Sequence, residues 1–142
     1  MGNIGFTELI LILILSVGFG LIPTIFYLIS LQDTLNLVKP ENRRMDPGQV
    51  WLTLIPLFGI IWQFIMVGNI ADSLKAEFQS RNIQLLEERP GYSLGLAYSI
   101  LTCVALIPIV GILTGIAAFI CWLLYWIKIS GFKTQLLYTK PA

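Results

Sequence analysis

The sequence predicts an all-α integral membrane protein: a bundle of four transmembrane helices in a single domain over residues 1–142. Two observations support this class. The chain is 56% hydrophobic and 12% charged, with a mean hydropathy of +0.81, whereas about a quarter of the residues in soluble domains are charged. It also contains uncharged runs long enough to cross a bilayer. A small soluble domain could not bury this much apolar surface, because small domains bury the smallest share of theirs.

The first predicted span covers about 8–31, and residues 9–31 carry no charge. At ~1.5 Å per residue this segment reaches about 35 Å, which is enough to cross a hydrocarbon core. Pro23 lies in its middle. Because proline removes a backbone hydrogen bond from a helix, we expect a kink there. A polar loop over 32–46 follows, although its first part, residues 32–38, could run on as a short interfacial helix.

The second predicted span covers about 49–71 and begins just after Asp46, which suits a helix cap. Pro56 predicts a kink in this helix as well. The amphipathic segment 72–89 should continue the helix beyond the membrane as a polar extension, with a turn near Asn82.

A tight hairpin of two helices is predicted next, because the chain is uncharged for 38 residues, from 90 to 127. As one helix this run would measure about 57 Å, too long for one crossing. The turn site around Pro108 divides it into spans of about 92–108 and 111–129. The first is short for a core of about 30 Å, which allows part of the hairpin to lie shallow or re-entrant. The tail, 130–142, is polar and expected to be loosely ordered at its end.

Glycine pairs four residues apart flank this hairpin, and they allow two interpretations. Gly91 with Gly95, and Gly111 with Gly115, fit the small-xxx-small pattern that lets helix backbones approach closely. They also fit turns and helix entries, where glycine is common.

The distribution of Lys and Arg predicts the orientation in the membrane. With four spans, six of these residues fall on the side of the two termini and three on the other side. Cytoplasmic loops carry the excess of Lys and Arg. We therefore expect both termini in the cytoplasm.

The candidate polar contacts within the membrane are Glu8, Thr53, Gln63 and Asn69. The three uncharged side chains should face other helices, where they find hydrogen-bond partners. Glu8 allows two interpretations. It suits the membrane interface at the positive end of the first helix, and it could also belong to an ion site, since acids beside a span are often functional.

Catalytic, cofactor and metal sites are not expected. The chain has no histidine, the commonest general base and metal ligand, and no motif pairs a nucleophile with a base. Both cysteines, Cys103 and Cys121, lie in apolar runs and are interpreted as packing residues. The net charge of +1 argues against nucleic acid, which requires a basic patch.

The sequence therefore predicts a non-enzymatic membrane protein whose partners are the bilayer and either itself or another membrane protein. It would be an accessory or assembly subunit, or a homo-oligomeric scaffold, of a process that the sequence does not identify. Lys75, Glu77 and Arg81 would form its docking surface, because the polar segment is too long for a simple loop. The alternative is a small homo-oligomeric channel or transporter lined by the intramembrane polar residues.

Parts of the chain resemble two protein families. The N-terminal MGNIGFTELILILILSVGFG resembles the first helix of the A-type subunit of the twin-arginine translocase over residues 1–20. PENRRMDPGQVWLTLIPLFGIIWQFIMVGNIADSLKAEF, RPGYSLGLAY and LLYWIKISGFK are similar to an uncharacterised family of small bacterial multispan integral membrane proteins. This second resemblance implies a multi-pass protein of the bacterial cytoplasmic membrane.

Overall fold

The computed structural model describes residues 2–139, and within this range the backbone forms five helices and no strand. This confirms the predicted all-α class. Two of the helices, α1 and α4, are long and apolar enough to cross a membrane. The elements are α1 (Phe6–Leu37), the 3₁₀ helix η1 (Pro47–Leu54), α2 (Phe58–Ser80), α3 (Tyr92–Ala105) and α4 (Gly111–Tyr138).

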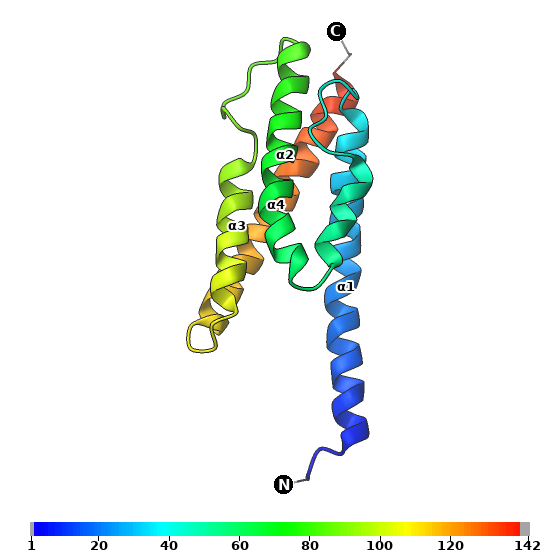
Figure 1. Cartoon of the computed structure of the whole chain (residues 1–142), viewed down its shortest axis with the longest axis vertical. Coiled ribbons are helices and arrows are strands. Elements are labelled where there is room, and N and C mark those ends of the chain that lie inside the picture. The colour runs from blue at the N-terminus through cyan, green and yellow to red at the C-terminus, as the bar shows by residue number, and fades with distance from the viewer. Residues whose placement is uncertain (1, 140–142) are drawn as a thin grey trace.

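Helix α1 is longer than the predicted span and runs through Pro23 without a break in the ribbon (Figure 1). The hydroxyl of Thr24 donates a 2.8 Å hydrogen bond to the carbonyl of Gly20 in the preceding turn. Residues 32–37, where a short interfacial helix was the alternative to a polar loop, form its last turns. Only this end is packed: the buried residues of α1 lie between Tyr27 and Leu35.

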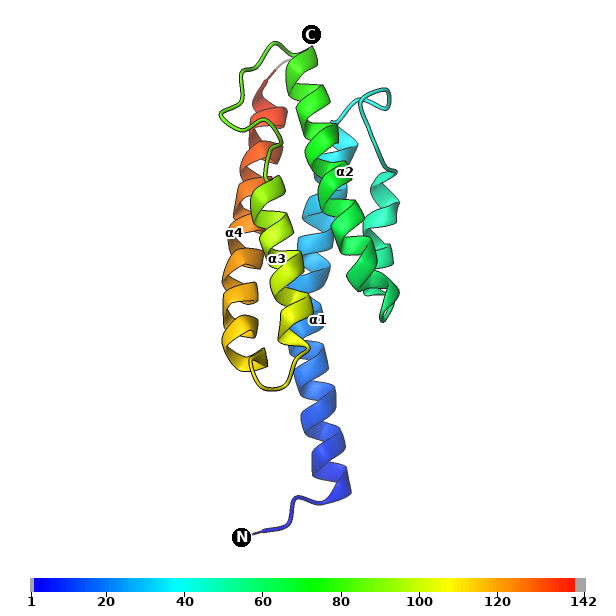
Figure 2. The ribbon, with the colours of Figure 1, turned by 60° about the vertical axis from the view of Figure 1, so that its left-hand side comes forward.

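The prediction of one span over 49–71 is wrong, because the chain reverses direction at Leu57. Helix η1 runs toward the N-terminal end of α1, and α2 runs back beside η1 (Figures 1 and 2). The side-chain hydroxyl of Thr53 on η1 lies 3.4 Å from the sulfur of Met66 on α2, and the indole N–H of Trp62 donates to the carbonyl of Gln49 at 2.9 Å. The segment is therefore a helical hairpin with both ends on the same side.

Local backbone geometry explains this reversal. Leu57 has a φ of 63° and a ψ of −53°, and the N–H of Phe58 bonds to the carbonyl of Pro56 at 2.7 Å, which together define a γ-turn. Gly59 allows the two arms to touch, since a Cβ atom there would lie 2.0 Å from the carbonyl oxygen of Thr53. Pro56 thus precedes a turn rather than kinking a helix.

The polar extension of α2 is confirmed as a helix as far as Ser80, and the turn expected near Asn82 is also confirmed. Asn82 has a φ of 57°, in the left-handed region that asparagine tolerates better than most residues. The remainder of the predicted segment, residues 81–89, belongs to the connection between α2 and α3, which is not helical.

Helices α3 and α4 form a helical hairpin whose ends differ from those predicted, and of the two only α4 is long and apolar enough to cross a membrane. Helix α3 stops at Ala105, and Gly111 begins α4 where a Cβ atom would lie 2.7 Å from the carbonyl oxygen of Ala105. Helix α4 continues to Tyr138, so residues 130–138 extend the helix beyond the predicted span, and the loose order expected at the end of the tail concerns residues outside the described range. Leu136 is buried there, which anchors this part of the helix. Residues 140–142 lie outside the described range.

The helices contact one another around a ring: α1 packs against η1, η1 against α2, α2 against α3, α3 against α4, and α4 against α1. Helix η1 thus lies between α1 and α2 in this ring. At one point three helices come close, because a Cβ atom on Gly95 would lie 2.4 Å from Val67 on α2 and 2.9 Å from Tyr125 on α4. The close-approach interpretation therefore holds for Gly95, whereas Gly91 enters α3 with a φ of +72° and Gly115 faces open space.

The two ends of the molecule differ. The C-terminal ends of α1, α2 and α4 lie together at one end, and the N-terminal end of α1 projects alone beyond the other helices (Figure 1). All the Lys and Arg residues of the described chain belong to segments at the first end, while Glu8 is the one Asp, Glu, Lys or Arg within residues 2–32. The described N- and C-terminal ends therefore lie at opposite ends of the molecule.

Candidate functional site at the charged end

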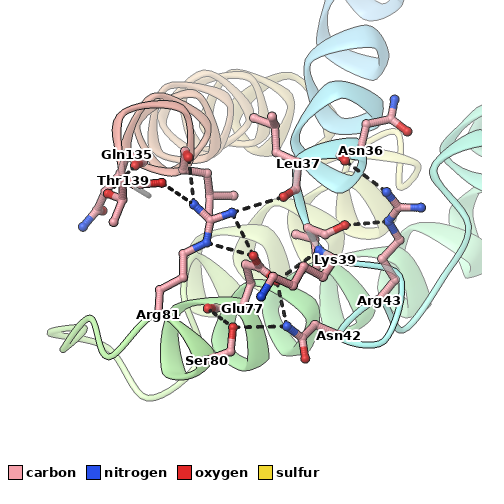
Figure 3. A network of polar contacts seen from close by, with 12 residues as sticks. Asn36, Leu37, Lys39, Asn42, Arg43, Glu77, Ser80, Arg81, Gln135 and Thr139 are labelled. Atoms are coloured by element: carbon pink, nitrogen blue, oxygen red, sulfur yellow. Dashed lines mark hydrogen bonds and ion pairs between the residues drawn. The ribbon is translucent and has the colours of Figure 1, made fainter. Parts of the chain in front are cut away.

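The candidate site lies where the C-terminal ends of α1, α2 and α4 meet (Figure 3). Each helix end leaves backbone carbonyls without helical donors and carries a partial negative charge. Three such ends in one place require donors and positive charge. Two arginines supply them, Arg81 just after α2 and Arg43 in the loop after α1.

Arg81 joins the three helices. Its Nη1 donates to the carbonyls of Leu136 and Thr139 at the end of α4, both at 2.8 Å. Its Nη2 donates to the carbonyl of Leu37 at the end of α1 at 3.4 Å, and its Nε donates to Oε1 of Glu77 at 2.8 Å. The side chain is 4% exposed. The guanidinium therefore caps the C-terminal ends of α1 and α4 and is held in place by a carboxylate.

Glu77 is fully buried and completes this arrangement. Its Oε2 accepts the backbone N–H of Lys39 at 3.0 Å and the side-chain amide of Asn42 at 2.7 Å. Burial alone would raise the pKa of Glu77, but these hydrogen bonds and the charge of Arg81 outweigh it and lower the pKa below its usual value. Glu77 thus remains ionised and ties the loop after α1 to α2. We call Glu77, Arg81, Lys39 and Asn42, with the carbonyls that Arg81 binds, the Glu77–Arg81 cluster.

Arg43 closes the end of α1 from the other side. Its Nε donates to the carbonyls of Leu35 and Val38 at 2.8 and 2.9 Å, and its Nη2 donates to that of Asn36 at 3.0 Å. A guanidinium in this position satisfies carbonyls that lack helical donors and interacts favourably with the helix dipole. The end of α1 is therefore held by two arginines.

Further ion pairs surround the cluster. Arg89 binds both carboxylate oxygens of Asp72 at 2.9 and 3.0 Å and lies over the ring of Tyr92. Lys133 on α4 contacts Asp33 on α1 at 3.0 Å, and Lys128 pairs with Glu87. These contacts connect α4 to α1 and to the segment before α3.

The side chains of the predicted docking surface, Lys75, Glu77 and Arg81, do not form one exposed surface. Glu77 and Arg81 are buried in the cluster, so no partner can reach them in this arrangement. Lys75 does lie at the surface, where its side chain is 33% exposed and 3.7 Å from that of Glu88. The three residues share a helical segment, but their side chains point to different environments.

The predicted intramembrane polar residues do not line a common path. Glu8 accepts the N–H of Gly5 at 3.0 Å and lies exposed at the free end of α1, as the interface interpretation expects. Gln63 is buried and donates to the hydroxyl of Ser99 at 3.2 Å, which joins α2 to α3. Thr53 contacts Met66 within the η1–α2 hairpin, and Asn69 is half-buried on α2, with its carbonyl bonded to Ser73.

An apolar groove of about 480 Å³ lies between α1 and the α3–α4 hairpin. Gly20, Pro23 and Thr24 form its wall on α1, and Trp122 and Trp126 belong to its wall on α4. Beside it, the ring of Tyr27 packs edge-on against both tryptophans. The hydroxyls of Tyr27 and Tyr125 are buried without a partner in the described part of the chain.

Sequence reasoning missed Asn42, Arg43 and Ser99. Arg43 follows the end of a helix, where arginine often bonds to the last carbonyls; this signal was lost because the end of the first helix was placed too early. Asn42 and Ser99 carried no signal, since their partners are 35 and 36 residues away. Among residues 2–139, no three His, Cys, Asp or Glu side chains come together in a way that could hold a metal ion.

The fold and the site thus define a helical protein with two helices of membrane-spanning length, closed at one end by a buried Glu–Arg cluster. Comparison of the chain with protein-family models, with curated proteins and with solved structures finds no match.

Proposed function

We propose that the protein is a non-enzymatic integral membrane subunit whose helix α1 packs against a helix of another membrane protein or of a second copy. The observation that carries the proposal is the projecting part of α1. None of the residues in its most apolar 18-residue stretch is buried. Residues 11–14 are 53–62% exposed, and four consecutive helical positions sample every face of a helix.

A helix that is apolar on every face needs an apolar environment, either lipid or other protein. In lipid, helices associate through close packing rather than through the hydrophobic effect. The rest of this chain does not cover the projecting part, while the Glu77–Arg81 cluster and Arg43 hold its other end firmly. This combination of a rigid base and an uncovered apolar helix supports a role in assembly.

The charge distribution supports an insertion in which α1 and α4 cross the membrane, the 14-residue α3 makes a short third crossing, and the η1–α2 hairpin enters and leaves from one side. All Lys and Arg of the described chain then face that side, which the positive-inside rule makes cytoplasmic. The N-terminus would lie across the membrane, in place of the same-side arrangement expected for four spans. The resemblance to small bacterial membrane proteins makes the cytoplasmic membrane of a bacterium the proposed location.

The channel or transporter alternative receives less support. The amide of Gln63 is bonded to Ser99, and Glu8 lies at the far end of α1, away from the other polar residues of the apolar region. A water-filled path would require polar groups that face a common space.

Cysteine cross-linking in membranes tests the assembly role. Single cysteines at residues 11–14, in a background with Cys103→Ser and Cys121→Ser, sample the faces of α1 in turn. If one face packs against a partner, cross-linking should be strong at one or two of the four positions, and mass spectrometry of the product would identify the partner. Ile112→Cys, exposed on α4, is the matched control. Equal yields at all four positions and at the control would contradict the proposal.

Labelling with a membrane-impermeant thiol reagent tests the orientation in the same background. We expect Gly2→Cys to react from outside intact cells and Glu41→Cys to react only after permeabilisation. Reaction of both cysteines from the same side would contradict three crossings and favour an even number.

A further inference from the structure

We infer that the groove between Arg44 and Lys75 binds the phosphate of an anionic lipid headgroup. The groove measures about 340 Å³ and lies between the loop after α1 and the start of the polar part of α2. Arg44, Lys75, Asp72 and Gln79 line it. The inference rests on the proposed membrane insertion and adds a ligand class to it.

Arg44 differs from the other arginines of the described chain. Arg43, Arg81 and Arg89 each bind carbonyls or a carboxylate, whereas the guanidinium of Arg44 is exposed and has no partner among residues 2–139. Its backbone is nevertheless held in place, because its N–H donates to the hydroxyl of the buried Ser73 on α2 at 2.9 Å. The backbone of Arg44 is thus fixed to α2, and its side chain is available for an external anion.

The charges in the groove favour an anion. Lys75 is held only weakly, since its 3.7 Å pair with Glu88 involves a carboxylate that is 90% exposed, and exposed pairs of this kind contribute little. The carboxylate of Asp72 also lines the groove, but Arg89 binds both its oxygens. Arg44 and Lys75 therefore contribute two positive charges that nearby acids do not cancel.

The groove lies at the depth where headgroups are expected. Helix α2 is uncharged from Phe58 to Ala71 and charged from Asp72 onward. The groove begins at Asp72 and extends along the following two turns, to Gln79. In the proposed insertion, this boundary is where the hydrocarbon core gives way to phosphates, and the groove faces the cytoplasmic leaflet, which carries a negative surface potential.

Native mass spectrometry of the detergent-solubilised full chain tests the inference. The protein is titrated with phosphatidylglycerol and, as a control, with phosphatidylcholine of the same acyl chains. We expect tighter binding of phosphatidylglycerol. Each cationic contact near a surface changes affinity by about fivefold, so the double variant Arg44→Gln with Lys75→Gln should bind phosphatidylglycerol about thirtyfold more weakly. Glu41→Gln, an exposed change in the same loop, should not weaken binding.

Several outcomes would overturn the inference. Equal binding of the two lipids would mean that the headgroup charge is not recognised, and unchanged binding by the double variant would place the site elsewhere. Competition by millimolar inorganic phosphate against phosphatidylglycerol would assign the groove to a free anion. Carbonate-resistant association of the same variants with vesicles shows whether the protein inserts into membranes, so a failure of lipid binding can be told from a failure of insertion. An unchanged unfolding midpoint shows that the double variant is folded.

Discussion

Replacing Arg81 with leucine should destabilise the protein more than any other single charge removal at the charged end. The change leaves the buried carboxylate of Glu77 without its counter-ion and removes the donors to the carbonyls of Leu37, Leu136 and Thr139. Breaking a buried ion pair by removing one partner costs about 3–5 kcal/mol. Because Arg81 also closes two helix ends, we expect a loss of stability in the upper part of that range, about 4–5 kcal/mol.

Denaturant unfolding in mixed micelles, followed by the fluorescence of the four tryptophans, measures this loss. Glu77→Leu and the double variant complete a thermodynamic cycle. We expect the double variant to lose about 2–3 kcal/mol less than the sum of the single variants, since residues in one buried network are strongly coupled. The control is Lys75→Met, which removes a surface pair and should cost less than about 1 kcal/mol.

The coupling of Arg81 with Glu77 would be refuted if the stability losses of the two single variants summed to that of the double variant within about 0.5 kcal/mol, the limit for independent sites. It would also be refuted if Arg81→Leu cost no more than Lys75→Met, because the guanidinium would then contribute no more than a surface charge.

Three further predictions concern the same cluster and two close contacts. Hydrogen bonds and the charge of Arg81 lower the pKa of Glu77 in the folded state. Ionised Glu77 therefore stabilises the fold fully at neutral pH, and this contribution is lost as the pH falls below about 4.5, through the lowered pKa. Glu77→Gln should flatten this part of a profile of unfolding midpoint against pH. Gly59→Ala should cost about 1–3 kcal/mol, since its Cβ would overlap a carbonyl of η1, whereas Gly115→Ala, in open space on α4, should be neutral or stabilising by up to about 1 kcal/mol. Gly95→Ala should destabilise, and Val67→Ala should reduce the loss only in part, because Tyr125 would still lie 2.9 Å from the new Cβ. The same unfolding assay measures both variants, and a loss that Val67→Ala does not reduce would contradict the clash with Val67.

The reversal at Leu57 shows why one predicted span was wrong. Residues 49–71 are uncharged and long enough to cross a membrane, so the length criterion is met. The turn depends on a positive φ at a leucine and on the contact between Gly59 and a carbonyl six residues earlier. Neither feature has a clear sequence signal, because leucine rarely adopts that conformation and a glycine in an apolar run is common.

The Glu77–Arg81 cluster could not be predicted for a different reason. Glu77 and Arg81 were identified as part of the polar extension of the second helix, and a solvated, amphipathic helix was the natural interpretation. Whether such side chains face water or other helices depends on where the ends of α1 and α4 arrive. Those ends lie 44 and 55 residues away along the chain, as the hydrogen bonds of Arg81 to Leu37 and Leu136 show.

The sequence by itself determined the helical class, the two helices of membrane-spanning length, the turn near Asn82 and the α3–α4 hairpin. These features depend on composition and on local periodicity, which are properties of neighbouring residues. The tertiary structure alone decided the η1–α2 reversal, the burial of Glu77 and Arg81, the exposure of the Arg44 guanidinium and the opposite positions of the two described ends. These features depend on which distant segments meet, since a charged side chain is buried only where other helix ends supply its hydrogen bonds.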